Sequence, residues 1–80
     1  MRADKKINRI KKDLAKNLTA YRKERNHTYE ALSEKTNLDK ELIKQIENGA
    51  SNPSLKDIVK ISAALEVPIH TLLSPESYKS

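Results

Sequence analysis

The 80-residue sequence contains no cysteine, no tryptophan and no phenylalanine, and its one glycine is Gly49. Without cysteine the chain can form no disulfide bond, which favours an intracellular protein. Its apolar runs fall far short of the roughly 20 residues that a membrane span requires, and the signal-peptide pattern is absent. These absences predict a soluble, cytoplasmic protein that is not inserted in a membrane.

Candidate metal ligands and catalytic residues are also scarce. His27 and His70 are the two histidines, and neither has a cysteine or another histidine at the spacing of a metal site. No combination of serine, histidine and acid typical of nucleophilic catalysis stands out, because Ser33, Ser51 and Ser54 are more simply interpreted as packing, loop or capping residues. We therefore expect no metal, no cofactor and no enzymatic activity.

Positive charge is concentrated at the start of the chain. Residues 1–25 hold ten lysines or arginines against three carboxylates, a net charge of +7, whereas residues 26–80 hold six against eight, a net charge of −2. Such a basic segment is typical of an arm that contacts phosphates, of a helix on an anionic membrane surface, or of a face that keeps the protein in solution. The charge by itself leaves all three interpretations open.

Apolar side chains recur at helical spacing within this basic segment, at Ile7, Ile10, Leu14, Leu18 and Tyr21. No glycine or proline interrupts residues 5–25, so we expect one helix about 30 Å long. Ile7 and Ile10 would then extend beyond the domain and would need a partner, either a second copy of the chain or its own C-terminal tail. A frayed basic arm before Leu14 is the alternative.

Two short helices joined by a tight turn are predicted between residues 28 and 49. Thr28 is suited to cap the first of them, over residues 28–36. Asn37 tolerates the left-handed backbone that closes a helix, and Asp39 can cap the next one. We expect that second helix to begin at Lys40 and to stop at Gly49.

The helix that begins at residue 40 has an apolar and a polar side. Ile43 and Ile46 share one face, while Glu41, Gln45 and Asn48 lie opposite. Long hydrogen-bonding side chains on one exposed face suit the reading of base edges, because a helix in the major groove of DNA presents one face to the bases. A solvated surface face is the ordinary alternative.

Two further helices are predicted in the rest of the chain. Residues 50–54 form a loop by composition, and Ser54 with Asp57 resembles a capping box. Apolar residues recur widely in residues 55–65, so we expect a helix that is buried over a broad face. Pro68 precedes a last short helix over residues 69–73, and residues 74–80 are expected to form a loose tail.

A spaced set of residues between positions 14 and 73 matches one known pattern. Its members are Leu18, Arg22, Leu32, Ser33, Ile43, Ile46, Glu47 and Gly49, followed by Pro53, Leu55, Ile58, Ile61, Leu65, Val67 and Leu72. The set resembles the phage-repressor, or Xre-type, helix-turn-helix family. The resemblance implies an all-α, five-helix, lambda-repressor-like domain over residues 14–73, with residues 1–13 as a basic extension of the first helix and residues 74–80 as a tail. With 36% hydrophobic residues, this domain would have a core that barely suffices, and a dimer contact would help it.

The same resemblance implies a sequence-specific transcriptional regulator, a repressor, that binds double-stranded DNA as a homodimer. The base-reading positions that it implies are Lys40, Glu41, Lys44 and Gln45. The positions that would contact the DNA backbone are Thr28, Tyr29, Asn48, Ser51 and Asn52. Arg22 and Glu47 are expected to form a structural ion pair. Two alternatives stay open, an antitoxin or adaptor-type module that binds a protein partner through Ile7 and Ile10, and a basic helix on an anionic membrane.

Overall fold

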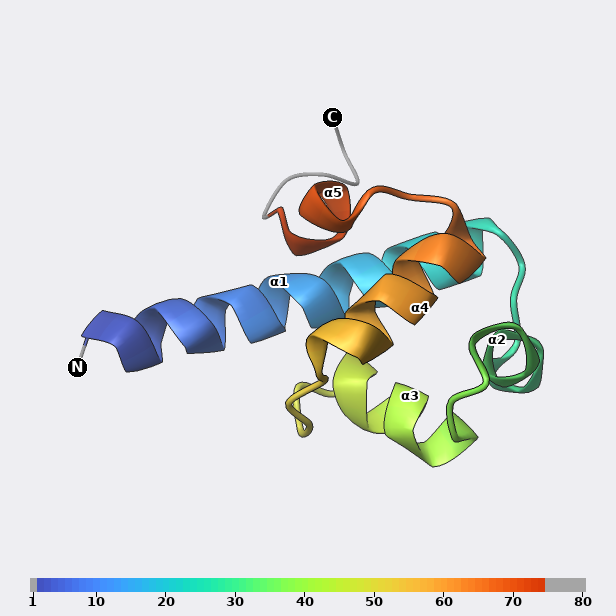
Figure 1. The fold of residues 1–80 in the computed structure, drawn as a ribbon, viewed down its shortest axis with the longest axis horizontal. Coiled ribbons are helices and arrows are strands. Elements are labelled where there is room, and N and C mark those ends of the chain that lie inside the picture. The colour runs from blue at the N-terminus through green and yellow to red at the C-terminus, as the bar shows by residue number, and fades with distance from the viewer. Residues whose placement is uncertain (1, 75–80) are drawn as a thin grey trace.

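The computed structural model describes the backbone of residues 2–74 and the side chains of residues 9–74. This part of the chain contains five helices and no strand, namely α1 (Arg2–Glu24), α2 (Tyr29–Thr36), α3 (Lys40–Glu47), α4 (Leu55–Leu65) and α5 (Ile69–Leu73). Figure 1 shows α1 along the longest axis of the molecule, with α3 and α5 on opposite sides of it. The prediction of an all-α fold with five helices is confirmed.

The first helix is a single uninterrupted element, as predicted. Its 23 residues span about 35 Å at roughly 1.5 Å per residue, and its N-terminal half extends beyond the other helices (Figure 1). Leu14 is 2% exposed, whereas Ile10, one turn earlier, is 41% exposed. Ile10 therefore lies at the edge of the domain, as expected, and the side chain of Ile7 lies outside those that the structure describes.

The core lies where the C-terminal half of α1 meets the other four helices. Each helix contributes at least one side chain that is almost fully buried. These side chains are Leu14, Leu18, Leu32, Ile43, Ile46, Ile61, Leu65 and Leu72. Because α2 packs against both α3 and α4, the two short central helices are held from two sides by the same core.

The ends of the helices are closed by the residues that the sequence indicates. The Thr28 hydroxyl accepts a hydrogen bond from the backbone N–H of Ala31, and the Asp39 carboxylate accepts one from Glu41. Asn37 lies in the left-handed region at φ 61° and ends α2. Ser54 and Asp57 form a capping box at the start of α4, so the predicted caps of all three helices are confirmed.

A buried amide attaches α5 to α1. The Nδ2 atom of Asn17 donates to the carbonyl oxygens of Leu72, at 2.7 Å, and Ser74, at 2.6 Å. Asn17 is 2% exposed, and a buried amide without partners would destabilise the fold. Both bonds go to the last turn of α5 and the residue after it, so this short helix has a defined position on α1. Residues 75–80, predicted to be a loose tail, lie outside the described part of the chain.

The expectation that α4 is buried over a broad face is wrong. Ile61 and Leu65 are fully buried, but Leu55 is 70% exposed and Val59 is 45% exposed. The physical reason is the packing of α4, which rests mainly on α2 and α5, so that none of the described helices covers the side carrying Leu55 and Val59. The first turns of α4 therefore add an apolar surface to the molecule.

Candidate nucleic-acid interface

The turn between α2 and α3 is held by side chains from both of its ends. The Ser33 hydroxyl donates to the carbonyl oxygen of Leu38 at 2.5 Å, and the Thr36 hydroxyl accepts from the Leu38 N–H at 3.2 Å. Thr36 also donates to the Leu32 carbonyl at 2.7 Å. These bonds lie in a buried or half-buried setting, where they restrict the backbone between the helices. The angle between α2 and α3 is consequently well defined.

Arg22 and Glu47 connect α1 to the C-terminal end of α3. The Nε atom of Arg22 donates to Oε2 of Glu47 at 2.6 Å, and Nη2 donates to Oε1 at 3.3 Å. The two side chains are 11% and 5% exposed. The hydrogen bond with Glu47 is the main cause that raises the pKa of Arg22. A two-point pair of this kind constrains both the distance and the orientation of the two side chains. It therefore fixes the C-terminal end of α3 against α1.

Tyr29 at the start of α2 joins the same pair. Its hydroxyl donates to Oε1 of Glu47 at 3.1 Å, and its ring lies 4.3 Å from the Arg22 guanidinium carbon. Burial, followed by the hydrogen bond to Glu47, raises the pKa of Tyr29. The hydroxyl that was expected to contact the DNA backbone is therefore already bonded within the protein, and Tyr29 links α2 to α3.

The side of α3 that faces away from the core carries the four predicted base-reading residues. Glu41 and Gln45 are exposed, and Lys40 and Lys44 are half-buried. The Lys44 ammonium lies 3.6 Å from the Glu41 carboxylate one turn before it. The structure therefore places the four side chains on one accessible face, with the negative charge of Glu41 next to a lysine.

Lys40 has a partner that the sequence pattern did not indicate. Its Nζ atom lies 3.3 Å from Oε2 of Glu30 in α2. The pKa of Glu30 is lowered, first by a hydrogen bond with its own backbone and then by Lys40. Glu30 and Lys40 are ten positions apart on two different helices, so no helical spacing could have indicated this pair. The bond between Tyr29 and Glu47 was not predicted for the same reason.

The residues expected to contact the DNA backbone fall into two groups. Thr28 is exposed directly before α2, whose backbone N–H groups give that end a positive potential. Asn48 follows the last turn of α3 and is exposed. Ser51 and Asn52 lie in the loop before α4, and of these two Asn52 is exposed. The groups thus lie at the N-terminus of α2 and the C-terminus of α3.

Clustered metal ligands and membrane-spanning helices are absent from the part of the chain that the structure describes. Among these residues, no three His, Cys, Asp or Glu side chains gather into a group that could hold a metal ion. Within residues 2–74, no helix combines the length and the apolar character needed to cross a membrane.

A short helix, a tight turn and a second helix with an accessible polar face, all carried by a small helical core, define a helix-turn-helix domain. The family model described as "Helix-turn-helix" (HTH_3) matches residues 18–72. The chain belongs to this family.

Relatives of known classification are similar over most of the chain. The "HTH-type transcriptional regulator SinR" of Bacillus licheniformis is 37% identical over 62 residues, which are 76% of this chain and 56% of the relative. SinR of Bacillus subtilis (strain 168) is 38% identical over 61 residues, 75% of this chain and 55% of the relative. The chain therefore spans about half the length of the curated relatives that it matches.

A solved structure has the same fold. The hypothetical transcription factor NHTF from Neisseria superposes with a TM-score of 0.80 at 28% identity, covering 88% of this chain and 80% of that chain. The likeness extends well beyond the two central helices, because 88% of an 80-residue chain must include α1 and α4 as well.

Proposed function

We propose that this protein is a sequence-specific DNA-binding transcriptional regulator that inserts α3 into the major groove. The observation that carries the proposal is the row of exposed polar side chains on α3, a helix whose opposite face is anchored by Ile43 and Ile46. The major groove admits one α-helix and distinguishes all four base pairs. Family membership and relatives named as transcriptional regulators support the same function.

The side chains on α3 suit different base edges. Gln45 can donate to and accept from adenine, and Lys40 or Lys44 can donate to the acceptors of guanine. Glu41 can accept from the amine of cytosine, although its charge is repelled by nearby phosphates. The ion pair of Glu41 with Lys44 at 3.6 Å reduces that repulsion. Together these groups can specify several neighbouring base pairs.

The two groups at the helix ends would position the domain on the sugar-phosphate backbone. Thr28 and the positive N-terminus of α2 suit one strand, and Asn48, Ser51 and Asn52 suit the other. We assign Tyr29 to the support of Glu47 rather than to a phosphate, because its hydroxyl is bonded to that carboxylate at 3.1 Å.

Repression and dimer formation are further parts of the proposal. Occupying a site that overlaps a promoter blocks transcription without any additional contact, so we propose that the regulator is a repressor. A helix-turn-helix unit that binds as a dimer reads two half-sites about one helical turn of DNA apart. Among the side chains of residues 9–74, three large apolar ones are exposed, Ile10, Leu55 and Val59, and they would favour association with a second copy.

The decisive experiment is a selection of genomic DNA fragments by the purified protein, followed by binding measurements on the enriched duplex. We expect one enriched sequence with twofold related halves, and a much weaker affinity for a scrambled duplex of the same composition. A reporter gene downstream of the enriched site should be expressed less when the protein is present. Equal affinity for all duplexes, together with a stoichiometric complex with another protein that DNA does not affect, would instead support the antitoxin or adaptor alternative.

A further inference from the structure

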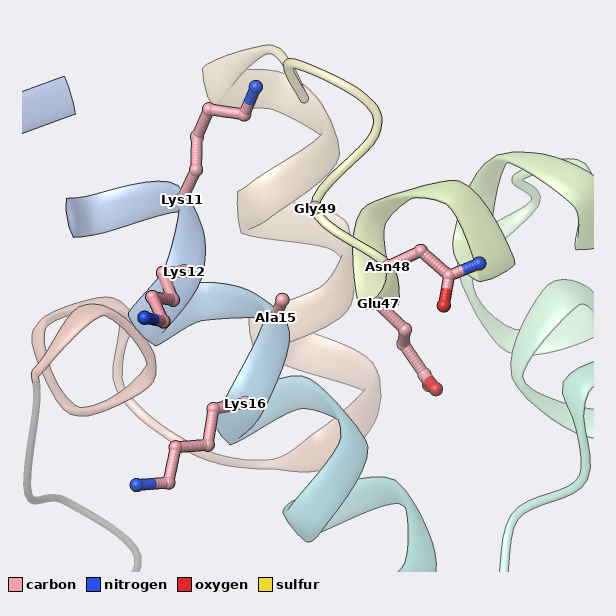
Figure 2. Close-up of a pocket in the computed structure, with 7 residues that line it drawn as sticks. All are labelled: Lys11, Lys12, Ala15, Lys16, Glu47, Asn48 and Gly49. Atoms are coloured by element: carbon pink, nitrogen blue, oxygen red, sulfur yellow. The ribbon is translucent and has the colours of Figure 1, made fainter. Parts of the chain in front are cut away.

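A cleft of about 470 Å³ lies between the middle of α1 and the C-terminal end of α3. Lys11, Lys12 and Lys16 line it together with Ala15, all from α1, and the opposite wall consists of Glu47, Asn48 and Gly49 (Figure 2). We call this the α1–α3 cleft. It adjoins the loop that we propose to contact the DNA backbone, but none of its lysines belongs to the helix-turn-helix unit.

The α1–α3 cleft carries an uncompensated positive charge. Among the described residues, the ion pairs involve none of Lys11, Lys12 and Lys16. The one carboxylate in the lining, Glu47, is already bound by Arg22 at 2.6 Å and by the Tyr29 hydroxyl at 3.1 Å. The stems of the three lysines line the cleft, and Figure 2 shows their ammonium groups at its rim, directed away from the wall formed by α3. Their flexible stems allow these ammonium groups to turn toward an anion bound there.

The two carboxylates in the described part of α1 do not lie on the side of the helix that carries Ala15. At about 3.6 residues per turn, Asp13 falls beside Asn17, whose amide binds α5. Glu24 lies on that same side, away from α3. Lys11 and Lys12 instead flank Ala15, which faces the cleft. Asp13 and Glu24, the carboxylates of the described part of α1, thus lie on the side of the helix opposite Ala15.

The wall formed by α3 does not repel an anion as strongly as a bare helix C-terminus would. Carbonyl oxygens in the last turn accept hydrogen bonds from backbone N–H groups that follow the helix. The N–H of Asn48 donates to Lys44, that of Gly49 to Ile46 and that of Ala50 to Gln45. Gly49, at φ +72°, has no atom within 4 Å of the position that a Cβ would occupy. This wall is therefore open at Gly49, whereas the Asn48 side chain points away from α1 (Figure 2).

We propose that the α1–α3 cleft binds a phosphodiester of duplex DNA that flanks the base pairs contacted by α3. This inference rests on the proposed function, because it takes the C-terminal end of α3 and the following loop to lie against the DNA backbone. Lysine binds phosphate as a point charge at the end of a flexible stem, which suits a backbone phosphate approached from the side. The extended α1 thereby lengthens the contacted stretch of DNA.

The test compares two variants with the same change in charge. The cleft variant carries Lys11→Gln, Lys12→Gln and Lys16→Gln. The control carries Lys23→Gln, Lys56→Gln and Lys60→Gln, which do not line the cleft.

Fluorescence anisotropy measures the affinity for the enriched duplex, with long flanks, over a series of salt concentrations. We expect the dependence of log K on log salt to flatten in the cleft variant by about 0.9 for each phosphate that its lysines no longer neutralise, and much less in the control. Equal flattening in both variants overturns the proposal.

A second duplex, trimmed to the base pairs that α3 reads, locates the bound phosphate. The wild-type slope should fall on this duplex to the value of the cleft variant, whereas the cleft variant should show the same slope on both duplexes. If the difference between wild type and cleft variant persists on the trimmed duplex, the cleft does not contact flanking DNA.

Small polyphosphates could supply the same chemistry, so pyrophosphate is titrated separately while the backbone amides of residues 11–16 and 48–50 are followed by NMR. We expect weak shifts without saturation. Saturable pyrophosphate binding that the cleft variant loses, with an unchanged DNA slope, would overturn the assignment to DNA. Failure of the proposed function looks different, because the wild type would then show no preference among duplexes and Gln45→Ala would change nothing.

Discussion

Arg22 and Glu47, 25 positions apart, form a two-point ion pair that connects α1 to the end of the helix proposed to read DNA, with Nε 2.6 Å from Oε2. Because the side chains are 11% and 5% exposed, removing one strands a charge that water reaches poorly. We expect Arg22→Met or Glu47→Leu alone to lower the free energy of unfolding by about 3 to 5 kcal/mol. The double variant should lose far less than the sum, as measured by urea unfolding, and a coupling energy near zero would refute the pair's role.

Tyr29→Phe removes the hydroxyl that donates to Glu47 at 3.1 Å and keeps the ring beside Arg22. A hydrogen bond to a charged group contributes about 1.5 to 3 kcal/mol, so the free energy of unfolding should fall by an amount in or just below this range. The affinity for both the enriched and the scrambled duplex should stay nearly unchanged, since we assign no phosphate to this hydroxyl. Equal weakening on both duplexes would restore Tyr29 to the backbone-contacting residues.

Gln45→Ala should weaken binding to the enriched duplex by about 1 to 3 kcal/mol and relax the preference at one base pair. The side chain is exposed and uncharged, so its loss should leave both the fold and the affinity for scrambled DNA nearly unchanged. Anisotropy titrations on the enriched site, its single-base variants and a scrambled duplex measure these effects at one salt concentration. Equal weakening on every duplex would show that this side of α3 does not read bases.

Glu41→Gln should act in the opposite sense on random DNA. The substitution removes a negative charge that faces phosphates and releases Lys44 from its ion pair at 3.6 Å. The affinity for scrambled duplex should therefore rise, while the preferred base at one position changes. Glu34→Gln, which removes the same charge from an exposed position on α2, is the matched control. If the control raises the affinity as much as Glu41→Gln does, the effect comes from the net charge of the protein and not from the position of Glu41.

His27 should make stability depend on pH. Burial, followed by the charges of Lys35 and Arg25, lowers the pKa of His27 from its ordinary value of 6.5. At pH values between the pKa of His27 in the folded protein and 6.5, the unfolded chain binds more protons than the folded protein does. The stability that neutral His27 contributes is therefore fully present above pH 6.5 and is lost as the pH falls through the pKa of the folded protein. As the pH falls through this interval, the free energy of unfolding should decline more steeply in the wild type than in His27→Gln. Parallel pH profiles for the two proteins would contradict this assignment.

Much of the fold could be predicted because its signals are local. Thr28, Asn37 and Asp39 close helix ends by bonds or backbone angles that involve residues within a few positions. The exposure of Leu55 was missed because Leu55 has the same apolar character as buried Ile61, and the choice between them depends on which side of α4 meets α2 and α5.

For the candidate site, the sequence by itself determined that Glu41 and Gln45 share an accessible face of one helix, because helical periodicity alone decides that relation. Only the tertiary structure decided that Lys40 pairs with Glu30, that the Tyr29 hydroxyl binds Glu47, and that Lys11, Lys12 and Lys16 line a cleft beside Gly49. These relations join residues on different helices, whose separation and crossing angle are set by the packing of side chains in the core. No spacing along the chain encodes that geometry. The charge or apolar character of a residue does not reveal which neighbouring helix will pack against it.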